Sequence, residues 1–231
     1  MQPYFFPYIG YFQLIHAVDV FVFLDDVPFI KKGWINRNRL AFNETATWFT
    51  VPLRGQSQHT LINDVRIAPE EFRRWRRKFM LSLQHFYGKA PHYQTGMALV
   101  DEVLAPDSDR MANLAVTAIT ACCRLLGITT RFFSSSAFSG SDLRGEERLI
   151  DLCNQASATE YINAPGGIGL YTKERFARNG LGLQFLLPGD IAYQADTVTH
   201  RLEFSILDAV MWCGPERISD NFLQQYSLSD G

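Results

Sequence analysis

The segment from residue 160 to residue 187 contains the pattern that most restricts the fold. A short β-forming run at Glu160–Asn163 leads into a glycine-rich loop at residues 165–169, which is followed by a helical stretch at 170–178, then Gly180 and a second β-forming run at 181–187. A strand-loop-helix-strand unit of this length is normally a right-handed crossover between parallel strands. The sequence therefore predicts an α/β fold.

The N-terminal part of the chain repeats this alternation of helix and strand. Residues 11–18 are compatible with a short helix, and residues 20–24 form a continuous apolar run that stops at Asp25-Asp26. Five apolar residues are too few for a typical helix and suit a strand covered on both faces. Alternation at both ends of the chain favours an open, mostly parallel sheet with flanking helices, as in Rossmann-like folds.

The middle of the chain is mainly helical. An apolar stripe follows Pro69 and ends at Gly88, and a second one runs over 108–126 and is closed by Gly127. Residues 69–127 are thus predicted to be a helical sub-lobe within a single domain spanning residues 1–231. The remaining predicted elements are strands at residues 48–53, 61–67 and 130–133 and a helix centred on residues 149–153.

Composition excludes several classes of protein. A chain of 231 residues with 47% hydrophobic residues can bury a sizeable core, and a net charge of -2 argues against a nucleic-acid binder. No apolar run approaches the roughly 20 residues of a membrane span, and no secretory leader is evident, so we expect no membrane insertion and a cytoplasmic location. The sequence leaves a homo-oligomer open.

Cysteine and histidine spacing predicts no metal site, and nothing in the sequence identifies a cofactor. The cysteines form no pair of zinc-ligand spacing, and three of them lie in helix-like apolar stretches, so we expect reduced core residues. The basic run at residues 73–78 surrounds Trp75, which belongs to an apolar stripe, and is therefore predicted to be a solvated helix face. The cysteines are Cys122, Cys123, Cys153 and Cys213.

Three loops are candidates for a binding site. In an open parallel sheet, ligands bind beyond the carboxyl ends of the strands, where loops supply polar groups. The loops are residues 2–10, 25–39 and 163–171. We expect them to meet around a small polar or anionic substrate. The candidate ligand-binding residues of the first loop are Gln2, Tyr4, Tyr8 and Gly10.

The second loop has the highest density of polar groups. Asp25 and Asp26 end a buried strand. Trp34 follows eight residues later, and two arginines, Arg37 and Arg39, come after it. Guanidinium groups suit bidentate contact with phosphate or carboxylate. The alternative is a solvated loop whose charges pair with one another. The candidates in this loop are Asp25, Asp26, Lys31, Lys32, Trp34, Asn36, Arg37, Asn38 and Arg39.

The third loop offers bare backbone amides. Gly166 and Gly167 precede a predicted helix, and the positive end of a helix together with exposed amides can hold an anion. The glycine spacing matches neither a P-loop nor a dinucleotide-binding fingerprint, and a tight turn explains it equally well. Asn163 and Tyr171 flank this loop and complete the candidate set.

Eight short motifs occur together along almost the whole chain. They are residues 2–12, 19–27, 34–39, 87–93, 134–136 and 160–171, the pair Tyr193-Gln194, and residues 205–208. This combination resembles the WbqC-like protein family. The resemblance implies a bacterial protein of surface polysaccharide biosynthesis and a reaction that transfers an aminoacyl group, such as glycyl, to an amino sugar. Family members usually carry a short apolar strand before the Gln-Pro pair, where this sequence has Met1; without it we expect a weakly anchored first loop.

A second resemblance concerns architecture. The segment Tyr8-Ile9-Gly10-Tyr11, followed by helix and strand, is similar to the His-x-Gly-His opening of nucleotidylyltransferases, with tyrosine in place of both histidines. Tyrosine donates a hydrogen bond but supplies no imidazolium charge. The resemblance implies a nucleotidylyltransferase-like fold and leaves the reaction open.

The leading hypothesis is an enzyme that transfers an acyl or aminoacyl group to an amino sugar or related amine, in polysaccharide or secondary-metabolite biosynthesis. Arg37, Arg39 and Lys31 would bind the anionic part of the substrate, and Asp25 would position or deprotonate the amine. Two carboxamides, Asn36 and Asn38, would orient the carbonyl. The alternatives are a non-catalytic ligand-binding or scaffold protein and nucleotide-dependent activation of a carboxylate.

Overall fold

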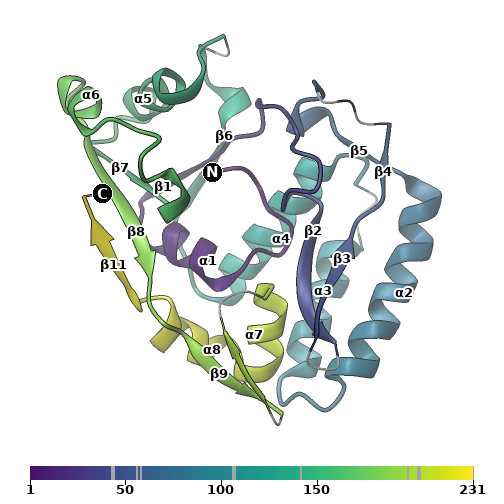
Figure 1. Cartoon of the computed structure of the whole chain (residues 1–231). Coiled ribbons are helices and arrows are strands. Elements are labelled where there is room, and N and C mark those ends of the chain that lie inside the picture. Colours follow the sequence, from purple (N-terminus) through teal and green to yellow (C-terminus); the bar gives the residue numbers. More distant parts are fainter. Residues whose placement is uncertain are drawn as a thin grey trace.

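Helices and short strands alternate through the chain in the computed structural model, which describes residues 1–42, 45–55, 57, 59–105, 108–140, 142–196, 198–201 and 204–230 (Figure 1). The fold is mixed α/β. The helices are α1 Ile9–His16, α2 Pro69–Tyr87, α3 Tyr93–Leu104, α4 Met111–Leu125, α5 Gly145–Gln155, α6 Lys173–Arg178, α7 Ile206–Cys213 and α8 Pro215–Arg217. The strands are β1 Val20–Phe23, β2 Arg37–Phe42, β3 Thr45–Thr50, β4 Leu53–Arg54, β5 Arg66–Ile67, β6 Arg131–Ser134, β7 Glu160–Asn163, β8 Gly182–Pro188, β9 Ala192–Ala195, β10 Val198–Arg201 and β11 Tyr226–Ser229.

Parallel pairing occurs in two places. β1 runs parallel to β6, from Val20 opposite Arg131 to Phe23 opposite Ser134. β7 runs parallel to β8, and β11 lies antiparallel on the other edge of β8. The parallel pairing of the two strands predicted within residues 160–187 is therefore confirmed. The helix between them begins at Lys173, later than predicted, and residues 165–167 form a 3₁₀ turn.

One open, mostly parallel sheet is not confirmed. The other hydrogen-bonded pairs, β2 with β3, β4 with β5, and β9 with β10, are all antiparallel, and the described strands form separate small sheets. Beside β1, the amino group of Met1 donates to the Val22 carbonyl oxygen at 2.9 Å, and the Leu24 amide donates to the Met1 oxygen at 2.8 Å.

Three elements differ from the sequence-based prediction. The expected strand at residues 61–67 is mostly a 3₁₀ turn at Ile62–Asp64, and only Arg66–Ile67 pairs as a strand. The expected strand at residues 48–53 begins earlier, at Thr45, and ends at Thr50, before Pro52 removes a backbone donor. The end of the expected loop at residues 25–39 belongs to β2, whose alternation was hidden because one of its inward residues is polar.

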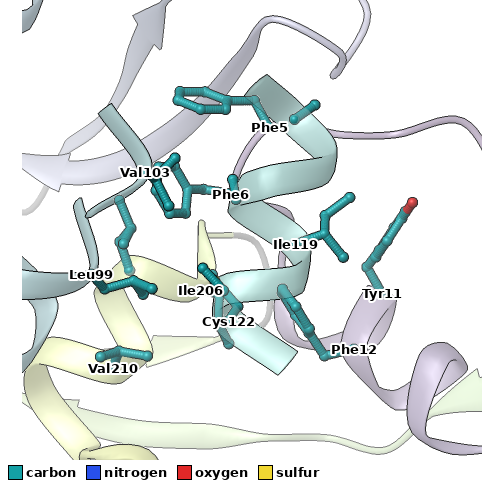
Figure 2. Packing of buried hydrophobic residues seen from close by; sticks show 14 of the residues in the cluster. Phe5, Phe6, Tyr11, Phe12, Leu99, Val103, Ile119, Cys122, Ile206 and Val210 are labelled. Atoms are coloured by element: carbon teal, nitrogen blue, oxygen red, sulfur yellow. The ribbon is translucent and has the colours of Figure 1, made fainter. Parts of the chain in front are cut away.

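The three long helices α2, α3 and α4 form the predicted helical region, apart from residues 106 and 107, which lie outside the described part. They share one core with the first loop and with α7. Figure 2 shows Phe5 and Phe6 of the first loop beside Val103 of α3, with Ile119 of α4 and Ile206 of α7 nearby. The first loop is thus packed into the centre of the molecule.

Two further predictions concern the cysteines and membrane insertion. Cys122, Cys123, Cys153 and Cys213 are all buried and free, as expected. Among the described residues, no helix is long and apolar enough to cross a membrane.

Candidate ligand-binding site

One cavity of about 950 Å³ lies where the three candidate loops meet. Leu24 follows the end of β1 and Asn163 ends β7, and both line this cavity at the carboxyl ends of these strands. The lining residues are Met1, Gln2, Tyr4, Tyr8, Leu24, Ile30, Trp34, Asn38, Arg39, Asn163, Ala164, Pro165, Gly166, Gly167, Leu170 and Tyr171. The three loops therefore converge on one cavity.

The first loop is held firmly, so the expectation of weak anchoring is wrong. Phe5 and Phe6 are completely buried, and Phe6 has a left-handed backbone with a φ of 43°. The Asn38 side-chain amide and the Ser205 hydroxyl both donate to the Phe6 carbonyl oxygen at 2.8 Å, and the Phe5 amide donates to the Trp34 oxygen at 3.1 Å. Burial and these bonds offset the strain of a left-handed phenylalanine.

Asn163 shapes the third loop. Its side chain is buried, and its Oδ1 accepts a hydrogen bond from the Ala164 amide at 2.8 Å. A Cβ at position 167 would lie 2.5 Å from Asn163 Nδ2 and 2.9 Å from the Tyr171 ring, so a side chain here would displace Asn163 or Tyr171. A Cβ at position 166 would meet nothing within 4 Å. The two glycines thus have different roles: Gly167 allows close packing and Gly166 leaves open space.

Arg39 is the one charged side chain among the described residues that line the cavity. Its guanidinium lies 5.4 Å from the centre of the Trp34 ring and 5.6 Å from that of Trp48. The two tryptophan rings are 5.1 Å apart, and Arg37 lies over Trp48 at 3.9 Å. These arginine and tryptophan side chains therefore stack on one another, and of the four only Trp34 and Arg39 line the cavity.

The tyrosines of the cavity are hydrogen-bond donors at neutral pH. Burial raises the pKa of Tyr4, Tyr8 and Tyr171 above the ordinary value of 10.0. Their phenols therefore stay protonated and can donate to a carbonyl or phosphate oxygen. None of them serves as a base near pH 7.

Asp25 does not line the cavity. Its carboxylate is buried and accepts hydrogen bonds from the Ser136 amide at 2.9 Å, from the Ser136 hydroxyl at 2.8 Å and from the Ser135 hydroxyl at 3.1 Å. These contacts connect the end of β1 to the end of β6. In this arrangement Asp25 positions the strand ends and does not face the cavity.

Asp26 is paired with Arg148, a residue that sequence reasoning missed. Arg148 NH2 lies 2.9 Å from Asp26 Oδ2 and donates to the Ser135 carbonyl oxygen at 2.8 Å, while NH1 lies 3.0 Å from Asp151. The Arg148 side chain is only 6% exposed. An arginine on the buried face of α5 is the signal that could have identified it, because buried arginines are normally paired.

The other predicted site residues also lie outside the lining. The Asn36 side-chain amide donates to the Val51 oxygen at 2.9 Å, and Arg37 Nε donates to the Gly33 oxygen at 3.0 Å. Gly10 belongs to α1, where a Cβ would collide with the Tyr8 ring. The residues predicted to bind or react that do not line the cavity are Asp25, Asp26, Lys31, Lys32, Asn36, Arg37 and Gly10.

A second cleft, of about 610 Å³, lies between β4, β5 and the start of α2. It contains several arginines, but two of them are neutralised: Arg66 pairs with Asp109, and Arg73 pairs with Glu70 at 2.6 Å. Within the described part of the chain, no cluster of histidine, cysteine or carboxylate side chains could hold a metal ion. The cavity at the strand ends is therefore the better candidate site.

Comparison with known proteins identifies a protein family and an uncharacterised relative. Residues 2–220 match the model of the WbqC-like protein family. An uncharacterised protein of Mycobacterium tuberculosis, Rv1507c, is 33% identical over 181 residues, which cover 76% of this chain and 74% of that protein. No solved structure shows significant similarity.

Proposed function

Starting from a chain that belongs to the WbqC-like protein family, we propose that it is an enzyme that transfers an acyl or aminoacyl group to an amino sugar or related small amine. Surface polysaccharide or secondary-metabolite biosynthesis would use such a product. The observation that carries the proposal is a single cavity with one cation, several neutral donors and no carboxylate among its described lining residues.

The size and charge of the cavity suit a nucleotide-linked substrate. A volume of about 950 Å³ lies at the upper end of the range for small-molecule sites. Arg39 binds the anionic part, and the amide of Gly166 lies in the same lining to share that charge, whereas the Gly167 amide donates to the Ala164 carbonyl oxygen at 2.9 Å within the turn. The Trp34 ring offers a flat apolar face to a sugar or a base.

The same charge balance favours a reactive amine. A nearby cation and the absence of a lining carboxylate disfavour the ammonium form, so a bound amine keeps its lone pair. The amine nitrogen attacks the acyl carbonyl carbon, the bond to the leaving group breaks, and the leaving group departs with that electron pair. The proton released by the amine passes to the leaving group or to water. Tyrosine hydroxyls stabilise the carbonyl oxygen during the attack.

The roles assigned to polar residues change accordingly. Asn38 lines the cavity and also holds the first loop, so it is a positioning residue. Asp25 and Asn36 act through the backbone that they fix. The proposal needs no direct contact of Lys31 or Arg37 with substrate.

Two wider aspects belong to the same proposal. The pairs β1-β6 and β7-β8 would be parts of a Rossmann-like, nucleotidylyltransferase-like arrangement, in which ligands bind at the carboxyl ends of the strands. A cytoplasmic location suits four cysteines that are all free.

The decisive comparison is between two arginines on one strand. Calorimetry with uridine diphosphate-glucosamine should show at least about tenfold weaker binding for Arg39→Gln, as expected for losing a charge-assisted contact, and little change for Arg37→Gln. Mass spectrometry after incubation with acyl-coenzyme A, or with an amino acid and ATP, should detect an acylated amine. Binding without product supports a non-catalytic ligand-binding protein, and equal affinity of the two variants refutes the site.

A further inference from the structure

The mouth of the cavity carries exposed aliphatic side chains from two separate segments. Ile30, in the loop after β1, is 58% exposed, and Leu170, after the glycine turn, is 70% exposed, yet both line the same cavity as Arg39. Single apolar residues on a surface are ordinary. Two of them that line one cavity place apolar surface beside polar groups such as Arg39 and Asn163.

We propose that this mouth binds an aliphatic chain, so that the ligand is an amphiphile with an anionic head near Arg39 and a linear acyl or alkyl chain between Ile30 and Leu170. This inference rests on the proposed function and narrows it, because it selects a fatty-acyl-like group over an aminoacyl group as the group transferred.

Charge supports that choice. An aminoacyl group carries an α-ammonium, which needs an acceptor or a carboxylate nearby. None of the described lining residues is a carboxylate, so none of them offers an ionic partner to that ammonium. A methylene chain needs no polar partner and gains contact with the exposed aliphatic groups.

The test is a chain-length series. Butyl, hexyl and octyl phosphate are titrated into the intact protein by calorimetry below their micelle concentrations. The dissociation constant should fall by about two- to fourfold per methylene, which is the range for partial to complete burial of one CH₂. In the Ile30→Ser/Leu170→Ser double variant this dependence should nearly vanish. The matched control is Leu81→Ser, because Leu81 is 59% exposed on α2 and does not line the cavity.

A second probe separates chain from charge. Hexyl phosphate should bind at least about tenfold more tightly than 6-aminohexyl phosphate, whose terminal ammonium would be desolvated in the mouth. No binding of any alkyl phosphate, affinity independent of chain length, or an unchanged dependence in the double variant each overturns the inference. The double variant could instead bind every alkyl phosphate more weakly to the same degree, whatever the chain length. That result would mean that Ile30 and Leu170 do not contact the chain, and it also overturns the inference. If Arg39→Gln binds the phosphate head group as tightly as the unchanged protein does, the proposed function fails. The dependence of affinity on chain length is a separate result and is not affected by that failure.

Discussion

Arg148 forms a polar network with Asp26, Ser135 and Asp151. Replacing Arg148 should destabilise the protein more than replacing any other residue of this network. Its side chain is 6% exposed and lies 2.9 Å from the carboxylate of Asp26, which is itself only 10% exposed. Arg148→Met keeps the aliphatic stem but leaves that carboxylate without its cation and the Ser135 carbonyl without a donor. Removing one partner of a buried ion pair costs about 3–5 kcal/mol, and we expect a loss of free energy of unfolding in that range.

Urea denaturation measures this loss as a shift of the transition midpoint at constant slope. The control is Arg73→Met, because Arg73 pairs with Glu70 at 2.6 Å with 65% and 74% of the two side chains exposed; the expected cost is about 0–1 kcal/mol. The double variant Asp26→Asn/Arg148→Met should recover about 1–3 kcal/mol relative to Arg148→Met, because the buried carboxylate at position 26 is no longer left without its cation. A loss for Arg148→Met no larger than that for Arg73→Met would refute the reasoning.

Two further predictions concern packing and pH. Gly167→Ala should lower the free energy of unfolding by about 1–3 kcal/mol in chemical denaturation, because its Cβ would meet Asn163 at 2.5 Å. The control variant Gly166→Ala should change the free energy of unfolding by under about 0.5 kcal/mol. Equal effects of the two substitutions would contradict the packing of the turn. Burial raises the pKa of the Cys153 and Cys213 thiols from 9.0 to about 11. Above pH 9 the unfolded chain loses these protons first, so the free energy of unfolding should fall between pH 9 and pH 11, and less steeply in Cys153→Ala/Cys213→Ala; parallel pH profiles would contradict the burial.

The sequence predicts elements whose residues interact with near neighbours. The apolar run at residues 20–24, the crossover at residues 160–187 and the stripe after Pro69 all appear in the structure, because strand and helix periodicities are local. β2 escaped prediction because Asn38 faces inward, where its amide holds the first loop. No periodicity rule anticipates a buried carboxamide whose partner lies more than thirty residues away.

The site was predictable at the level of segments and less so at the level of side chains. Chain order indicates which loops follow the strand ends, so their convergence was expected. Which way each polar group points depends on tertiary partners: Asp25 turns to the serines after β6, and Arg37 turns to the backbone of its own loop. The aliphatic mouth residues were missed because an exposed leucine or isoleucine is not unusual alone. Arg148 was missed because its partner Asp26 lies 122 residues away in the sequence.

One nuclear magnetic resonance titration tests most directly whether residues 2–10, 30–39 and 163–171 form a single ligand site. With uridine diphosphate-glucosamine, the indole N–H of Trp34 and the amides of Gly166 and Gly167 should shift together with one dissociation constant, whereas the amide of Gly127, in the turn after α4, should not move. Shifts confined to one segment, or centred on the cleft lined by Arg54, Arg66 and Arg73, would contradict the account.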